Sequence, residues 1–309
     1  EAGSCVMPAR LFFDIVRKLP DEMVSITVDH KQQVSIRAGA AFFQITAMDS
    51  EDYPELPDVN GKSGVTMPQS ALKAMISGTI FSVSENQARP IQTGCLMEVT
   101  EDSVTMVAVD SFRLARRTWH TENAANHTLK FVVPAAGLKE IERILEDSDE
   151  PVTFTLGDKH ILFSIGDALL VSRVLEGEFI DWRRVVPTNC GTVLTANVAE
   201  LTSSIERVSL IISEKVKSPV RCVFGDNMAD FRTANTIGSA HDTCSIAGNG
   251  GELEIGFNSR YLLDALRVIP SEEVTLELQN GLSPIVFTPC DKKYDFAYMV
   301  LPVRLRSNS

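Results

Sequence analysis

MPQSALKAMISGTI, residues 67–80, decides the fold, because the same pattern recurs four more times at nearly even spacing. The other copies are MPARLFFDIVRKL at 7–19, VPAAGLKEIERIL at 133–145, ANVAELTSSIERV at 196–208 and FNSRYLLDALRVI at 257–269. Each copy has Pro or Asn at its second position and a large apolar residue four positions later. More apolar residues follow after another three or four positions, which places them on one face of a helix. The repeat therefore predicts five similar amphipathic helices.

Runs with strand character follow each of these segments. After the first come MVSITV (23–28), QQVSIRA (32–38) and AFFQITAM (41–48), in which β-branched or aromatic residues alternate with polar ones. After the fourth come VRCVFGD (220–226), ADFRTAN (229–235) and DTCSIAG (242–248). Each unit is thus expected to be strand–helix–strand–strand–strand. The predicted fold class is α+β, with helices on one side of antiparallel sheets.

The units alternate in kind, so the true period is two units and a domain is a pair of them. Counting back from the C-terminus predicts one domain at 188–309 and another at 64–187. Residues 1–63 then form the second half of a further domain, whose first half is expected before Glu1.

Composition excludes several classes of protein. The formal charge is −12 and the apolar fraction is 44%, which is ordinary for a globular protein. No apolar run is long enough for a membrane helix, and no secretory leader is visible. The six cysteines form no C-x-x-C pair, which favours reduced thiols in the cytoplasm over a metal or redox site. We expect no metal, no cofactor and no membrane partner.

A metal-dependent phosphoryl-transfer enzyme is one alternative. Carboxylates cluster at Asp49, Glu51, Asp52 and Glu55, and again at Glu146, Asp147, Asp149 and Glu150. Both clusters fall at expected turns, where acidic residues are usually solvated. The five histidines show no H-E-x-x-H pattern, and the glycines at 248–251 lack the Lys-Ser/Thr of a P-loop. We therefore expect no catalytic residues.

Five segments, some of which overlap the repeat, resemble in their order and spacing the bacterial replicative sliding clamp family, the β subunits of DNA polymerase III. They are PARLFFDIVRKLP (8–20), MVAVDSFRLARR (106–117), GEFIDWRRVVP (177–187), ELEIGFNSRYLLDAL (252–266) and YMVLPVRL (298–305). The resemblance implies a head-to-tail ring of two chains, each with three similar domains. Helices would line a hole around duplex DNA, and sheets would form the outer wall. Such a ring is a non-catalytic subunit of DNA-directed DNA polymerase, a nucleotidyltransferase, and acts as its processivity factor in DNA replication.

The expected DNA contacts are basic side chains on the helices. The resemblance places Arg10 and Arg143 there, and the helical segments add Arg17, Lys73, Lys139, Arg207, Arg260 and Arg267. Phosphate contacts carry no sequence information, which suits sliding. Ala135 and Ala136 stand where the family often has basic residues. A DNA-independent adaptor that keeps only peptide binding is therefore the second alternative.

The resemblance also implies a groove for short peptides of polymerases, the clamp loader and repair proteins. Its expected residues are Arg89, Ile91, Gln92, Val109, Ser111, Phe112, Arg113, Leu114, Pro187, Thr192, Met299, Leu301, Pro302, Val303 and Arg304. Gln92 replaces a common aliphatic residue, so peptide preference is expected to differ.

Ring closure is expected to join Phe43 and Ile45 of one chain to Leu210 and Ile211 of another. If the chain starts at Glu1, we expect weak dimerisation and an unstable 1–63 segment.

Overall fold

The structure is a computed structural model that describes residues 3–20, 23–53, 57, 59, 64–122, 128–212 and 218–305. The chain forms two compact units, Glu1–Asp58 and Val59–Ser309, which are treated separately below.

The first unit packs one helix against a small antiparallel sheet. Its elements are α1 (Ala9–Val16), β1 (Ser25–Val28), β2 (Gln33–Ala38), β3 (Ala41–Thr46) and η1 (Ser50–Asp52), with strand order β1-β2-β3. Ile15 of α1 is buried against Val34 and Ile36 of β2. Phe43 and Ile45, on alternate positions of β3, pack partly buried against the same core. The alternation expected from the sequence is therefore confirmed for β2 and β3, whereas β1 is exposed at all four of its positions.

The second unit combines a four-stranded and a ten-stranded sheet. The first has the order β11-β10-β9-β4, and the second β13-β14-β12-β15-β16-β17-β7-β6-β5-β8. The four helices of this unit among the described residues are α2 (Gln69–Ser77), α3 (Ala135–Ile144), α4 (Val198–Ser209) and α5 (Ser259–Leu266). The short 3-10 turns are η2 (Ile80–Ser82), η3 (Pro90–Thr93) and η4 (Trp182–Arg184). The strands are β4 (Gly64–Pro68), β5 (Gly94–Val99), β6 (Ser103–Val109), β7 (Arg113–His120), β8 (Leu129–Pro134), β9 (Pro151–Leu156), β10 (His160–Ile165), β11 (Ala168–Arg173), β12 (Thr192–Asn197), β13 (Val220–Ala234), β14 (Ser239–Phe257), β15 (Glu273–Leu278), β16 (Ile285–Pro289) and β17 (Phe296–Val300).

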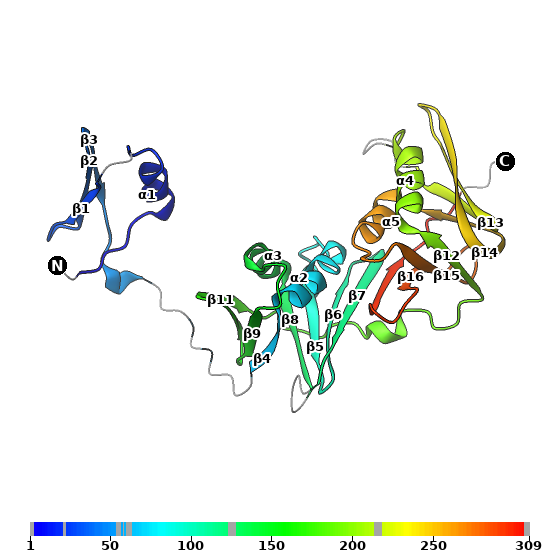
Figure 1. Cartoon of the computed structure of the whole chain (residues 1–309), viewed down its shortest axis with the longest axis horizontal. Coiled ribbons are helices and arrows are strands. Elements are labelled where there is room, and N and C mark those ends of the chain that lie inside the picture. The colour runs from blue at the N-terminus through cyan, green and yellow to red at the C-terminus, as the bar shows by residue number, and fades with distance from the viewer. Residues whose placement is uncertain are drawn as a thin grey trace. The chain divides into compact units, whose positions relative to one another are not determined.

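All five expected helices are present, so the α+β prediction is confirmed (Figure 1). The repeated Pro or Asn is the N-cap, one residue before the helix begins, rather than a residue of the first turn. Asn197 and Asn258 cap with their side chains, accepting the N–H groups of Glu200 and Arg260 at 3.0 and 3.1 Å. Pro134, like the other two prolines, makes no side-chain cap and holds an extended backbone before its helix.

The fourth unit of the repeat differs from expectation. Its separate strands are fused into one long hairpin, β13–β14, whose register shifts around Asp226. Asn227, Gly248 and Gly251 have positive φ values at this point. Such residues let a strand bulge without ending the ladder, so the Gly and Asn signals mark bulges here and not turns.

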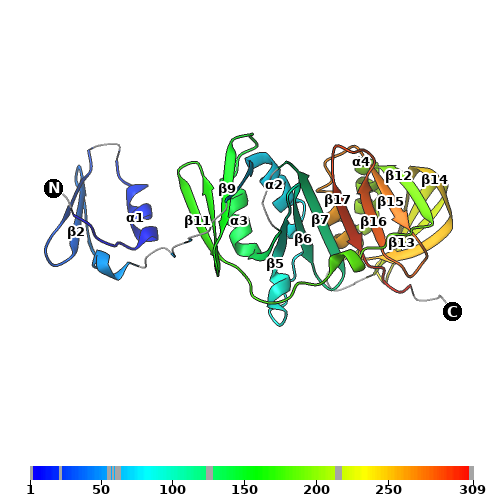
Figure 2. The ribbon, with the colours of Figure 1, turned by 90° about the horizontal axis from the view of Figure 1, so that it is seen from below.

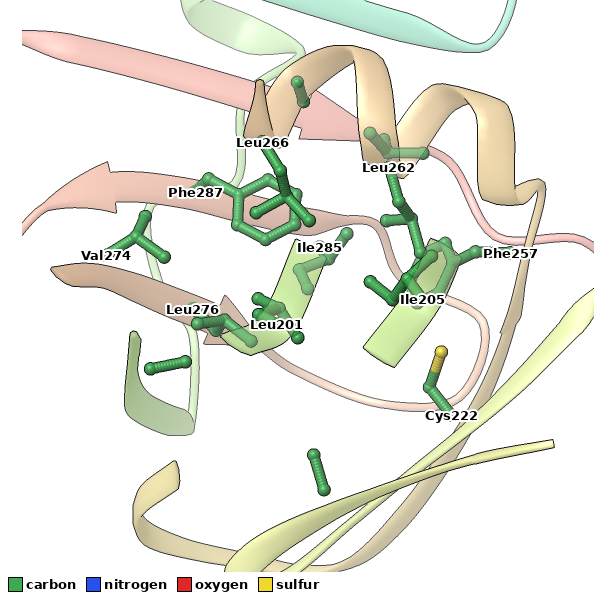
Figure 3. Packing of buried hydrophobic residues seen from close by; sticks show 14 of the residues in the cluster. Leu201, Ile205, Cys222, Phe257, Leu262, Leu266, Val274, Leu276, Ile285 and Phe287 are labelled. Atoms are coloured by element: carbon green, nitrogen blue, oxygen red, sulfur yellow. The ribbon is translucent and has the colours of Figure 1, made fainter. Parts of the chain in front are cut away.

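The helices of the second unit lie on one side of its strands (Figure 1). Leu201 and Ile205 of α4 and Leu262 and Leu266 of α5 are buried in one cluster with Phe257, Ile285 and Phe287, as Figure 3 shows. A matching cluster joins α2 and α3 to β5 and β6.

The opposite face of the sheet carries a third apolar cluster. The ten-stranded sheet runs without a break across the expected boundary between 64–187 and 188–309, because β7 pairs antiparallel with β17 (Figure 2). We call the face away from the helices the outer face.

Candidate functional site

The turn between β6 and β7 presents an aromatic side chain at the end of the sheet. The Asp110 carboxylate accepts the backbone N–H groups of Phe112 and Arg113 at 2.7 and 2.9 Å. An Asp that binds the backbone two residues on fixes the turn. The Phe112 side chain is thereby held at the surface, with 53% of its area exposed.

Arg113 ties this turn to helix α5. Its guanidinium lies 3.1 Å from Asp110 and 2.6 Å from Asp264, with only 10% of the Arg113 side chain exposed. The same group lies 4.5 Å from the ring centroid of Tyr261, which itself stacks on Phe112 with centroids 5.6 Å apart. The sequence pattern did not indicate Tyr261 and Asp264 as site residues, because they occupy polar-face positions of a helix that was expected to contact DNA.

The C-terminal tail completes one wall of the site. The N–H of Leu301 donates to the Phe112 carbonyl at 2.8 Å, and the N–H of Val303 donates to the Gly256 carbonyl at 2.7 Å. A Cβ added at Gly256 would lie 2.6 Å from Leu305 Cδ2, so the close approach of the tail requires glycine there. Leu301 and Val303 remain 37% and 42% exposed.

The floor beneath this wall is the third apolar cluster. Leu114 and Met299 are direct register partners in β7 and β17, and both are buried together with Val109. Exposed apolar side chains thus border a fully buried apolar floor at the end of two paired strands. This arrangement can receive hydrophobic anchors of an extended peptide.

Residues 174–187, which we call the strap, cross the outer face between β11 and β12. Trp182 donates its indole N–H to Glu98 at 3.3 Å, and the Arg183 guanidinium lies 2.8 Å from the same carboxylate. Lys130 approaches it at 3.5 Å. Burial by itself raises the pKa of Glu98, but the hydrogen bond and charge of Arg183, helped by Trp182 and Lys130, bring it below its ordinary value. The ionised carboxylate of Glu98 therefore holds the strap against the outer face.

The remaining candidates for the peptide groove are less tightly grouped. Ile91 packs partly buried on the third cluster, while Arg89, Ser111 and Arg304 are exposed. Gln92 is partly buried, and its side-chain oxygen has no hydrogen-bond partner among the described residues. Pro302 of the tail and Pro187 at the end of the strap are also partly buried.

Thr192 is not brought beside Leu114. Its register partner is Leu278 of β15, a residue of the helix-side core. Its own strand, β12, is separated from β17 by β15 and β16. Its neighbour Val193 faces the outer side instead, because Val193 pairs with Glu277, which pairs with Val286 of the third cluster.

The candidate DNA contacts divide into paired and free cations. Five of the eight lie near a carboxylate: Lys73 with Asp147 (3.1 Å), Arg143 with Glu140 (2.6 Å), Arg207 with Asp242, Arg260 with Asp264 (4.0 Å) and Arg267 with Glu206 (2.8 Å). The hydrogen bond and charge of Arg207 lower the pKa of Asp242. Arg10, Arg17 and Lys139 are exposed and have no ion pair within the described part of the chain. Arg17 also lies over the Phe13 ring at 5.4 Å.

The expected interface residues differ in exposure. Phe43 and Ile45 face the core of their own unit, whereas Leu210 at the end of α4 is 82% exposed. Ile211 is partly buried, and its carbonyl accepts a hydrogen bond from the Asn235 side chain at 2.8 Å.

The two acidic clusters form turns and caps. The Asp49 side chain accepts the Glu51 N–H at 3.2 Å, and residues 148 and 150 offer backbone carbonyls to the N-terminus of α2. The Asp52 side chain and Glu55 lie outside the described residues. Among those described, no group of three or more acidic, His or Cys side chains is arranged to hold a metal ion. No helix in the described ranges is long and apolar enough to cross a membrane.

Comparison with known proteins assigns nearly all of the chain to one family. Residues 1–57, 66–181 and 183–304 match the N-terminal, central and C-terminal domains of the DNA polymerase III beta subunit. The chain is 31% identical to the "Beta sliding clamp" of Staphylococcus epidermidis, over 98% of this chain and 81% of the relative. Its structure is similar to the DNA polymerase sliding clamp from Bacillus subtilis, with a TM-score of 0.92 and 31% identity over 98% and 80% of the two chains. A clamp from Pseudomonas aeruginosa bound to griselimycin gives a TM-score of 0.91 at 29% identity, over 99% of this chain and 82% of that one.

Proposed function

Because the chain belongs to the family of DNA polymerase III β subunits, the bacterial sliding clamps, we propose that it is a processivity factor. It has no catalytic step of its own. It encircles duplex DNA in the cytoplasm as a head-to-tail ring of two copies and holds the replicative polymerase near its template. Repair proteins and the clamp loader use the same groove.

The main support for the peptide groove is the hydrogen bond from the Leu301 N–H to the Phe112 carbonyl at 2.8 Å. It sets the apolar tail beside the β6–β7 turn, over the buried pair Leu114 and Met299. Partners insert an aliphatic and an aromatic side chain here, and a few such anchors supply most of the affinity. The griselimycin complex of the Pseudomonas aeruginosa clamp supports a ligand-binding surface in this family.

DNA is held by sequence-independent phosphate contacts from the helices. Arg10, Arg17 and Lys139 are available directly, because they are exposed and have no carboxylate partner in the described part of the chain. The five paired cations exchange a carboxylate for a phosphate when DNA is present. Contacts of this kind weaken steeply as salt rises, which permits sliding.

The proposed domains are 1–63, 64–187 and 188–309. The three family matches support this division. In the ring, Leu210 and Ile211 of one copy meet the sheet that carries Phe43 and Ile45 in the other. The 82% exposure of Leu210 is what supports its place at a contact between copies, since a large apolar side chain so exposed gains from burial.

A peptide titration tests the groove. A labelled Gln-x-x-Leu-Phe peptide is added to the full chain while fluorescence anisotropy is measured, and the experiment is repeated with Leu301→Ala. Leu282→Ala is the matched control, because Leu282 is also an exposed leucine (77%) but lies in the β15–β16 turn. We expect Leu301→Ala to weaken binding about tenfold or more and Leu282→Ala to leave it unchanged. Equal affinities in all three proteins would exclude this groove.

A further inference from the structure

A second cavity lies on the outer face, at the seam between the two sheets of the second unit. It has a volume of about 530 Å³ and is framed by β8, the β9–β10 turn and the beginning of the strap. We propose that this cavity is a second docking site, which takes a basic peptide segment through one apolar anchor side chain. The site goes beyond the groove of the proposed function and uses none of its wall residues.

The walls of the cavity are fixed by backbone hydrogen bonds. The N–H of Leu175 donates to the Val132 carbonyl of β8 at 2.9 Å, and the N–H of Val174 donates to the Lys159 carbonyl at 3.0 Å. The strap is thereby attached to both sides of the seam. Glu98 pins it again farther along, through Trp182 and Arg183. A cavity with such walls exists before a ligand arrives, which lowers the cost of binding.

The floor of the cavity is apolar and continuous with the floor of the groove. Leu96, Val132 and Phe179 line it, and all three are at least 96% buried members of the third apolar cluster, to which Leu114 and Met299 also belong. The strap therefore covers the middle of one apolar strip and leaves an opening at each end. One opening is the groove, and the other is this cavity, which has room for a leucine or phenylalanine side chain.

The rim of the cavity selects for positive charge. Asp158 and Glu178 are exposed at its edge, and neither has a cationic partner within the described ranges. Lys130 is the only basic residue of the lining among those described, and its ammonium is already 3.5 Å from Glu98. The two free carboxylates make a rim that attracts lysine or arginine on either side of an anchor.

The probe for this site is a labelled Lys-Lys-Phe-Lys-Lys peptide, measured by fluorescence anisotropy on the full chain. Unlabelled Gln-x-x-Leu-Phe peptide is present at saturation to occupy the groove. The chain is acidic overall, so Lys-Lys-Ala-Lys-Lys controls for general charge attraction and Ser-Ser-Phe-Ser-Ser controls for the anchor alone. We expect the affinity of each control peptide to be at least about tenfold lower than that of the probe.

The matched variants reverse charge at exposed positions. Asp158→Lys with Glu178→Lys should weaken the probe about tenfold, whereas Glu101→Lys with Asp167→Lys, which changes net charge equally in other turns, should have little effect. The Gln-x-x-Leu-Phe affinity, measured separately, should be the same in both double variants, so failure here is distinct from failure of the groove. The proposal is overturned if the alanine peptide binds as well as the probe, if the groove peptide displaces the probe, or if the two double variants behave alike.

Discussion

The tie between Arg113 and Asp264 makes a quantitative prediction. The Arg113 side chain is 10% exposed and the Asp264 side chain 23%, at a separation of 2.6 Å. Asp264→Ala leaves a largely buried guanidinium with Asp110 as its only close carboxylate in the part of the chain that the structure describes. Loss of one partner from a buried, charged hydrogen bond costs about 2 kcal/mol. Because the pair also anchors the β6–β7 turn, we expect Asp264→Ala to lower both the free energy of unfolding and the affinity for a Gln-x-x-Leu-Phe peptide.

Urea unfolding and the peptide titration measure the two effects. The control is Glu206→Gln, since the Arg267–Glu206 pair joins α5 to α4 at a similar 2.8 Å but its side chains are 56% and 45% exposed. An exposed pair contributes about 0.5 kcal/mol, and Glu206 does not touch the turn. If Asp264→Ala costs no more than Glu206→Gln, the burial argument is wrong. If only stability falls and peptide affinity stays the same, Arg113 does not organise the groove.

Three further predictions concern the strap, the thiols and DNA. Because the pKa of Glu98 is depressed in the folded protein, its contribution to stability is present above its unfolded pKa of about 4.3 and is lost as pH falls through the folded value. Loss of the Glu98 anion should change the fluorescence of Trp182, which donates to it, and Glu98→Gln should remove this acid transition. Iodoacetamide should modify exposed Cys290 first and spare Cys95, because burial raises the pKa of Cys95 to about 12; early labelling of Cys95, seen by mass spectrometry, would contradict the described core. Lys139→Glu should weaken DNA binding and lower its salt slope by roughly one to two, whereas Lys159→Glu, in the β9–β10 turn, should not.

The helices were predictable because helix periodicity is a local property of the chain. Leu72, Leu138, Leu201 and Leu262, each four residues after its Pro or Asn, are all buried. Phe12, at the same place in the first copy, is only partly buried. The strand runs were predictable for the same reason, except in β13–β14, where glycine and asparagine in left-handed conformations continue a ladder that they usually end.

The site was only partly predictable, because it joins segments that are far apart in the chain. The resemblance to clamps placed Phe112 and Leu301 in one groove, and the structure joins them by a hydrogen bond. It did not indicate Tyr261 or Asp264, whose partners in the β6–β7 turn are some 150 residues away, as the 151-residue separation of Arg113 and Asp264 shows. Pairing of charges across such distances depends on sheet register and helix packing, which no local pattern records.

The central claim is that partners bind the groove at the junction of β7 and β17. Photo-crosslinking tests this claim most directly. A Gln-x-x-Leu-Phe peptide with benzoylphenylalanine in place of its Phe is irradiated on the full chain, and the attachment points are mapped by mass spectrometry. We expect attachment at Phe112 and in the tail at 301–303. Attachment confined to the first unit, or to the exposed apolar residues Val193 and Leu282, would contradict it.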